Sequence, residues 1–299
     1  MEKTKKIMTK RKRTEIGICS GIIAAMVIAV MLGGCIGEKE PGDGTGIGDE
    51  LSGSLTVTGS TTVLPIAQQT ADAFMDKHPE VNIQVSGGGS SVGVQAVGSG
   101  TADIGMASRE LRDKEKTEYP NLVKHVVARD GVAVILHKNN PVPSLAMEQI
   151  KKIYNGEITN CKEVGGGDMP IVVINRDSAS GTRETFHTLV MDKEDFVKTA
   201  LEKNSNGAVK TTVAQTPGAI GYAGLGYVDS KIKAIKVNKE GQLIDPTAKN
   251  VADGKYPISR DINMFTDGQP TGLEKAYLDF IKSSEGQTIV EKEGFVSII

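Results

Sequence analysis

The sequence predicts an α/β fold of two lobes, each built on a mostly parallel sheet flanked by helices, and three observations support this fold class. Strand-like apolar runs alternate with helix-like segments along most of the chain, which is the pattern of α/β units. The 299 residues are enough for two modest domains with their own cores. Loops rich in Gly, Ser and Thr follow several strand ends, and open α/β sheets bind ligands at that edge.

The N-terminal residues 1–34 are predicted to be a signal peptide. Lys and Arg dominate residues 1–15, and an apolar run covers residues 16–32. Small residues then lead directly to Cys35, which resembles the lipobox of bacterial lipoproteins and implies that Cys35 becomes a lipidated first residue. The alternative is an uncleaved anchor helix, for which the run is short. In both cases the body is expected outside the cytoplasm, held at the cell membrane.

Residues 35–53 are Gly-rich and acidic, and we expect a flexible tether there. The body that follows contains a single cysteine, Cys161, so it cannot form an internal disulfide. A formal net charge of −2 argues against nucleic acid as a partner. The histidines stand apart from one another, and no metal or cofactor site is predicted.

The first strand–turn–helix unit opens the folded part. Residues 55–58 have the pattern of a strand, residues 59–62 form the turn, and Pro65 suits the first turn of a helix. The turn carries three adjacent hydroxyl residues, which are Ser60, Thr61 and Thr62.

Two further strand ends repeat this plan. Residues 81–85 alternate as a half-buried strand, and after a Gly triplet Ser90 and Ser91 begin a short helix. A following apolar strand ends at Ser108.

The most informative segment is IVVINRDSASGTRETF, residues 171–186. An apolar strand ends at Arg176, and Ser180, Gly181 and Thr182 stand where the first N–H groups of a helix lack partners. Those N–H groups, the hydroxyls and the helix dipole favour an anion, and the Arg176 guanidinium adds a planar fork of donors. Asp177 either supplies an acceptor or orients Arg176. The loop contains no Lys, so nucleotide hydrolysis is not indicated.

The remaining pattern completes the two lobes. Strands are expected at 132–137, 219–222 and 232–237, and helices at 144–154, 208–215, 273–281 and 284–291. With hinge crossings near residues 137 and 224, lobe I contains 54–137 and 224–299, and lobe II contains 138–223. Facing each other, the lobes would enclose a small ligand.

Five segments together resemble a known family: TGSTTVLP (58–65), SGGGSSVG (86–93), ADIGMASREL (102–111), NRDSASGTR (175–183) and PGAIGYAGLGYV (217–228). They are similar to the phosphate-binding component of ABC-type phosphate importers, which has the type II periplasmic-binding-protein fold. The resemblance implies a monomer that carries inorganic phosphate to the permease subunits. It also implies a set of phosphate-binding residues: Ser60, Thr61, Thr62, Ser90 or Ser91, Ser108, Arg176, Ser180, Gly181 and Thr182. Well-known members have an Asp where this chain has Ser108, so discrimination against sulfate, which has no proton to donate, is less secure.

Parts of the sequence are also compatible with other functions. The serious alternative is a binding protein for another tetrahedral oxyanion, such as sulfate, molybdate or tungstate. Residues 89–93 fit the G-x-S-x-G nucleophile elbow of hydrolases, with Ser91 as the nucleophile. The later histidines lie in strand-like or helical runs rather than in loops, so an enzyme is not predicted.

Overall fold

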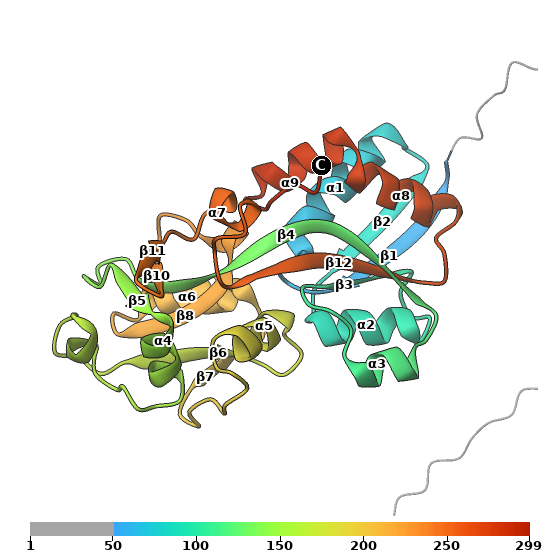
Figure 1. Ribbon diagram of the computed structural model, residues 1–299. Helices are drawn as coiled ribbons and strands as arrows, with labels where there is room; N and C mark the ends of the chain where they lie inside the picture. Colours follow the sequence, from blue (N-terminus) through green and yellow to red (C-terminus); the bar gives the residue numbers. More distant parts are fainter. Residues whose placement is uncertain (1–50) are drawn as a thin grey trace, which may run out of the picture. The chain divides into compact units, whose positions relative to one another are not determined.

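The computed structural model describes residues 51–299 (Figure 1). It begins with β1 (Gly53–Gly59), α1 (Leu64–Lys77), β2 (Val81–Ser86), α2 (Ser90–Gly98), β3 (Ile104–Ala107), α3 (Asp113–Glu118) and the long strand β4 (Leu122–His137). The middle part contains β5 (Ser144–Ala146), α4 (Met147–Tyr154), the 3-10 helix η1 (Cys161–Val164), β6 (Val172–Arg176), α5 (Gly181–Leu189), β7 (Leu201–Lys203), α6 (Asn206–Gln215), β8 (Ala219–Gly224) and the 3-10 helix η2 (Leu225–Tyr227). The last part contains β9 (Ile232–Ala234), β10 (Lys236–Lys239), β11 (Gln242–Ile244), α7 (Ala248–Ala252), β12 (Ser259–Asp267), α8 (Gly272–Lys282) and α9 (Ser284–Lys292).

The main sheet confirms the predicted α/β class. Its strands follow the order β2-β1-β3-β12-β4-β8-β6-β7, with β9 paired to β4 off this path. β1 runs parallel to β2 and β3, and β6 runs parallel to β7 and β8. Between these parallel groups, β12 and β4 pair antiparallel with each other. β5, β10 and β11 form a smaller sheet.

Two large hydrophobic clusters form the core, and β4 and β12 run from one to the other (Figure 1). In β4, Ala128 belongs to the first cluster and Val132 to the second. The returning segment has Ile258 in the second cluster and Ile262 in the first. The paired strands therefore join two separately packed halves, which we call the first half and the second half.

The packing places these crossings differently from the predicted hinge positions. Residues 225–258 were expected in lobe I, but Ile232, Val251 and Tyr256 pack in the second cluster. The chain therefore crosses between residues 128 and 132 and returns between residues 258 and 262, rather than near residues 137 and 224. The division into two lobes that move relative to each other stays a prediction.

Some elements also differ from the expected ones. The segment predicted as a helix over 144–154 begins as β5, because Ser144 to Ala146 pair in parallel with β10. The expected strand 232–237 is two short strands. β4 begins well before residue 132, and β12 was not predicted. Both strands carry charged residues that mask the apolar alternation, and their pairing with each other stabilises them.

The predicted signal peptide, Cys35 and most of the tether lie outside the described residues. Among residues 51–299, no helix has the length and apolar character that crossing a membrane requires.

Candidate functional site

The hydroxyls of three predicted strand ends lie together in the first half. Ser60 Oγ donates a hydrogen bond to Ser108 Oγ at 3.0 Å, and Ser90 Oγ lies 3.4 Å from Ser108 Oγ. All three residues are buried. Since β1 and β3 are parallel neighbours, their carboxyl ends lie at one edge of the sheet, where α2 also begins. We call Ser60, Ser90 and Ser108 the serine cluster.

A second group of hydroxyls joins the two halves. Thr62 Oγ1, from the turn after β1, lies 3.0 Å from Thr182 Oγ1 in the first turn of α5. Asn206, at the start of α6, donates from Nδ2 to Thr61 Oγ1 at 3.2 Å and to Thr62 Oγ1 at 2.9 Å. These four residues are buried, so each of their hydrogen bonds is formed away from bulk water.

The N-terminus of α5 faces the serine cluster. Ser180 is the N-cap, and its Oγ accepts a hydrogen bond from Arg183 N at 3.1 Å. Gly181 approaches so closely that a Cβ on it would lie 2.3 Å from Ser90 Oγ and 2.8 Å from Ser108 Oγ. The partial positive charge of this helix end therefore lies beside the hydroxyls, as the sequence predicted.

Arg176 ends β6 with its side chain buried. Its Nε donates to Lys203 O at 3.0 Å and its Nη2 donates to Asn204 O at 3.2 Å. Nη1 is buried and has no hydrogen-bond partner among the described residues. Burial lowers the pKa of the guanidinium, so a buried anion nearby would stabilise its charged form.

The orientation of Arg176 comes from backbone carbonyls and not from the neighbouring carboxylate. Within residues 51–299, no ion pair joins Arg176 to Asp177, and Asp177 Oδ1 is buried without a partner. The two carbonyls precede Asn206 by only a few residues, so one loop positions both Arg176 and the amide that contacts Thr61 and Thr62.

Ser91 is directed away from the serine cluster. Its Oγ accepts a hydrogen bond from Arg109 Nη2 at 3.1 Å, and its N–H donates to Ala179 O at 3.0 Å. The hydroxyl thus meets a guanidinium rather than the imidazole that a nucleophilic serine requires. Of the adjacent serines at the start of α2, Ser90 contributes its hydroxyl to the cluster.

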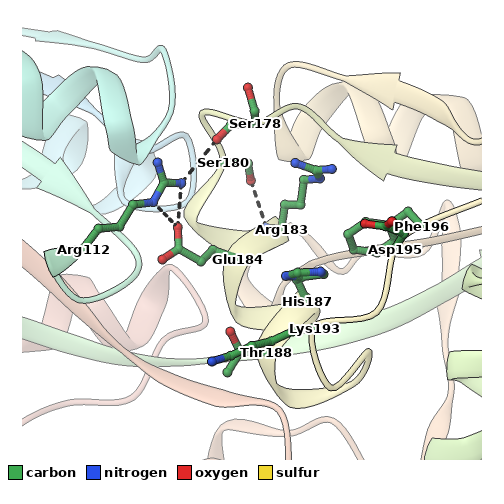
Figure 2. Close-up of a pocket in the computed structure, with 10 residues that line it drawn as sticks. All are labelled: Arg112, Ser178, Ser180, Arg183, Glu184, His187, Thr188, Lys193, Asp195 and Phe196. Carbon is green, nitrogen blue, oxygen red and sulfur yellow. Dashed lines mark hydrogen bonds and ion pairs between the residues drawn. The ribbon is translucent and has the colours of Figure 1, made fainter. Parts of the chain in front are cut away.

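An ionic network connects the two halves beside the site. Arg109 pairs with Glu115 at 2.7 Å, and its Nε lies 3.1 Å from Glu184 Oε2 of α5. Arg112 also pairs with Glu184, at 2.6 Å. Figure 2 shows this contact at the edge of a pocket of about 420 Å³ that Arg183, His187 and other residues of the α5 region line.

The pKa of Glu115 gives a prediction for stability. Burial alone would raise it, but hydrogen bonds from Arg109 and from the Arg112 N–H, with the charges of both, hold it below its ordinary value of 4.5. A lowered pKa adds stability that is present above pH 4.5 and lost as pH falls through the folded value. Glu115→Gln is expected to lower the free energy of unfolding by about 1 kcal/mol at pH 7.

Urea denaturation at pH 7 and at pH 3 measures this effect. The difference between Glu115→Gln and wild type should shrink at the lower pH, where wild-type Glu115 is also neutral. Glu118→Gln is the matched control, because Glu118 is exposed on the same helix. Equal losses at both pH values would contradict the assigned cause.

Sequence reasoning missed Asn206 and a buried ion pair next to the hydroxyls. Asp130 of β4 and Arg260 of β12 are paired at 2.7 Å, and Arg260 Nη2 lies 3.2 Å from Thr62 Oγ1. The available signal was the presence of charged residues, Asp130 and Arg260 among them, within two strands that are largely buried. That pattern does not identify the partner, because the partner comes from the other end of the chain.

The assembled groups are buried hydroxyls, a helix N-terminus and a guanidinium nitrogen without a partner among the described residues, which is the chemistry of an anion site. Within residues 51–299, no group of three His, Cys, Asp or Glu side chains is arranged to hold a metal ion.

Comparisons with known proteins point to one family. Residues 43–285 match the profile of the PBP superfamily domain. The chain is 36% identical over 290 residues to the phosphate-binding protein PstS of Bacillus subtilis. This alignment covers 96% of this chain and 95% of the relative.

Two solved structures are similar over most of the chain. A substrate-binding protein of a phosphate ABC transporter from Clostridium perfringens, with bound phosphate, is 40% identical, with a TM-score of 0.78 over 83% of this chain and 100% of that one. An ABC-type phosphate transport receptor from Vibrio cholerae is 35% identical, with a TM-score of 0.67 over 81% of this chain and 99% of that one.

Proposed function

The chain belongs to the PBP superfamily and, within it, to the phosphate-binding proteins of ABC transporters, and from this membership we propose how it holds its ligand. It is a binding protein for inorganic phosphate that serves an ABC importer, and it is not an enzyme. One observation carries the proposed site. Buried hydroxyls from both halves meet at the N-terminus of α5, and Arg176 Nη1 is buried without a protein partner among the described residues.

The proposed phosphate site contains hydroxyls, N–H groups and one guanidinium from both halves. Its members are Ser60, Thr61, Thr62, Ser90, Ser108, Arg176, Ser180, Gly181 and Thr182. Ser91 belonged to the predicted set as an alternative to Ser90. Its contacts with Arg109 and Ala179 support a role in holding the halves together instead.

This donor set explains how a buried oxyanion is tolerated. Removing a bare anion from water costs on the order of tens of kcal/mol by idealised Born estimates unless other groups replace its water shell. Hydroxyls, helix N–H groups and Arg176 replace that shell with few formal charges. A site that relies on partial charges also suits a protein that must release its ligand.

Binding and closure are coupled in this arrangement. Ser60, Ser90 and Ser108 come from the first half, whereas Arg176, Gly181 and Thr182 come from the second. The full set of donors exists only when the halves meet, so a ligand that uses both favours the closed state. We propose that the closed state is the form that the permease subunits recognise.

Calorimetric titration tests the function directly, and we expect phosphate to bind with one-to-one stoichiometry.

Ser108 Oγ accepts from Ser60 Oγ, so its own proton can be donated either to Ser90 Oγ, 3.4 Å away, or to an unprotonated ligand oxygen. We therefore expect sulfate to compete measurably. Ser108→Asp should weaken sulfate binding at least about tenfold more than phosphate binding, because a buried carboxylate repels an anion that has no proton to share.

Each outcome of this titration has a distinct meaning. Absence of any heat or stabilisation with phosphate would contradict the proposed function. Stronger binding of sulfate, molybdate or tungstate than of phosphate would favour the other tetrahedral oxyanions. An unchanged ratio of phosphate to sulfate affinity in Ser108→Asp would remove Ser108 from the site.

The setting of the protein follows from its N-terminal sequence and its family. We propose that residues 1–34 are removed, that Cys35 carries the lipid, and that residues 35–53 tether a monomeric body on the extracytoplasmic side of the membrane. A membrane anchor keeps the binding protein close to its permease, which raises the effective concentration of the pair.

A further inference from the structure

The Asp130–Arg260 ion pair lies where the chain passes between the halves. Asp130 and Arg260 are directly opposite each other in the antiparallel pairing of β4 and β12. The Arg260 side chain is 4% exposed and the Asp130 side chain is 0% exposed. Asp130 Oδ2 accepts from both Nε and Nη2 of Arg260, and Oδ1 accepts from Leu225 N at 3.0 Å. The carboxylate therefore fixes the guanidinium plane.

The remaining contacts of Arg260 are with residues of the proposed phosphate site. Nη2 donates to Thr62 Oγ1 at 3.2 Å, and Nη1 donates to Ser108 O at 3.3 Å. A charged group buried this deeply is costly unless its partners compensate it, and two of its partners here belong to the ligand site. The position of Arg260 is thus linked both to the crossing strands and to the hydroxyls.

The orientation of the Asn206 side-chain amide determines which of its two polar atoms contacts Thr62. Gly224 N donates to Asn206 Oδ1 at 3.3 Å, which identifies this atom as the oxygen. The amide nitrogen therefore faces the threonines, and Nδ2 donates to Thr62 Oγ1 at 2.9 Å.

A hydroxyl has two lone pairs and one proton. At Thr62, Asn206 and Arg260 occupy both lone pairs with groups that can only donate. The single proton of Thr62 must then be donated, and it lies on the side of Thr182 Oγ1, 3.0 Å away.

We propose that Arg260, held by Asp130, is a positioning residue that makes the Thr62 hydroxyl an obligatory donor: its proton is directed to Thr182 Oγ1 in this structure, and to an unprotonated phosphate oxygen once ligand is bound. The proposal rests on the phosphate site described above and deepens it. Without Arg260, Thr62 would regain a free lone pair and could accept a proton from a P–OH group. The pair thereby favours the dianion of phosphate over its more protonated form.

The charged and titratable groups that face Arg260 come from three strands. Asp130 faces it from β4, Tyr222 from β8 and Arg176 from β6. Burial raises the pKa of Tyr222 far above neutrality, and it raises that of Tyr227 to about 12. Burial also raises the pKa of Asp130, and Arg260 opposes that shift. Asp130 is therefore a second source of pH dependence, and the Thr62→Val background, which keeps Asp130, separates its titration from the protonation of the ligand.

The experiment measures the phosphate Kd between pH 5.5 and pH 8.5 for wild type and for the double variant Asp130→Asn with Arg260→Gln. The double variant keeps a neutral hydrogen-bonded pair in the core and avoids an unpaired buried charge. We expect its Kd at pH 8.5 to rise about 10- to 100-fold, the range for a lost charge-assisted hydrogen bond. The variant no longer disfavours the protonated form of phosphate. Its Kd at pH 5.5 divided by its Kd at pH 8.5 should therefore be smaller than the same ratio in wild type.

Three further proteins make the result specific. Arg129→Gln is the control for loss of one positive charge, because Arg129 is exposed and lies next to Asp130 in β4. It should leave the phosphate Kd and the pH dependence of that Kd unchanged. Arg260→Lys keeps the charge but cannot reach Asp130 and Thr62 with a planar fork, so its pH profile should resemble that of the double variant. In a Thr62→Val background, changing Arg260 should no longer alter the pH profile.

The outcomes separate this proposal from the assignment of function. If wild type binds phosphate and both Arg260 variants keep its affinity and pH profile, Arg260 has no positioning role. A shift in the pH profile that persists in the Thr62→Val background would also overturn it. If wild type does not bind phosphate at all, the proposed function itself fails.

Discussion

Arg176→Ala is expected to weaken phosphate binding by about 2–4 kcal/mol, or roughly 30- to 700-fold in Kd. Arg176 is almost fully buried, and its Nη1 has no partner among the described residues. Nε and Nη2 are occupied by the carbonyls of Lys203 and Asn204, which leaves Nη1 for the ligand. The variant removes a formal positive charge that forms no ion pair with a carboxylate within residues 51–299.

Two variants separate charge from geometry at this position. Arg176→Lys keeps the positive charge but cannot bond both carbonyls and the ligand in one plane, so it should recover only part of the affinity. Arg129→Ala, at an exposed site, controls for the change in net charge. Calorimetry at pH 8 measures all three proteins, and thermal unfolding without phosphate checks that each is folded. Phosphate affinity in Arg176→Ala within about twofold of wild type would exclude Arg176 from the site.

The sequence was sufficient to predict the strand ends that carry the site. Ser60, Ser108 and Ser180 follow apolar strands, and a strand end followed by Gly, Ser or Thr is a local pattern. Parallel pairing then places such ends at one edge without further information. The grouping of these hydroxyls was therefore predictable from two things: the local pattern of a strand followed by Gly, Ser or Thr, and the rule that parallel strands end at the same edge of a sheet.

The choice between adjacent hydroxyls was not predictable in this way. Ser90 and Ser91 have the same side chain and both lie in the first turn of α2, but they face different neighbours. Ser90 faces Ser108, whereas Ser91 faces Arg109. The direction of each side chain depends on how α2 packs, which is a tertiary property.

Asn206 and Arg260 were missed for a related reason. Each contacts Thr62 from more than 140 residues away in the chain. No periodicity links such positions, and the Asp130–Arg260 pair becomes visible only when β4 and β12 are placed side by side. Charged residues in an apolar strand indicate a buried function, but they do not say which group they serve.

The second large effect is expected in stability, from Gly93→Ala. Gly93 lies in α2 where the helix crosses β1 and β3, and a Cβ there would lie 2.5 Å from Met106 O and 2.8 Å from Thr58 O. Both are backbone atoms of the sheet, so no side chain can rotate away. Overpacking of this kind costs about 3 kcal/mol, whereas the better helix propensity of Ala returns at most about 1 kcal/mol. The net loss is about 2 kcal/mol, or roughly 4–8 °C in Tm for a domain of this size.

Gly207→Ala is the matched control, because the same change in α6 meets nothing within 4 Å. It should leave Tm unchanged or raise it slightly through helix propensity. Gly93→Ala should also weaken phosphate binding, since α2 can relieve the clash only by moving outward and taking Ser90 away from Ser108. If Gly93→Ala matched Gly207→Ala in both Tm and phosphate affinity, the close packing of α2 on the sheet would not be what positions Ser90.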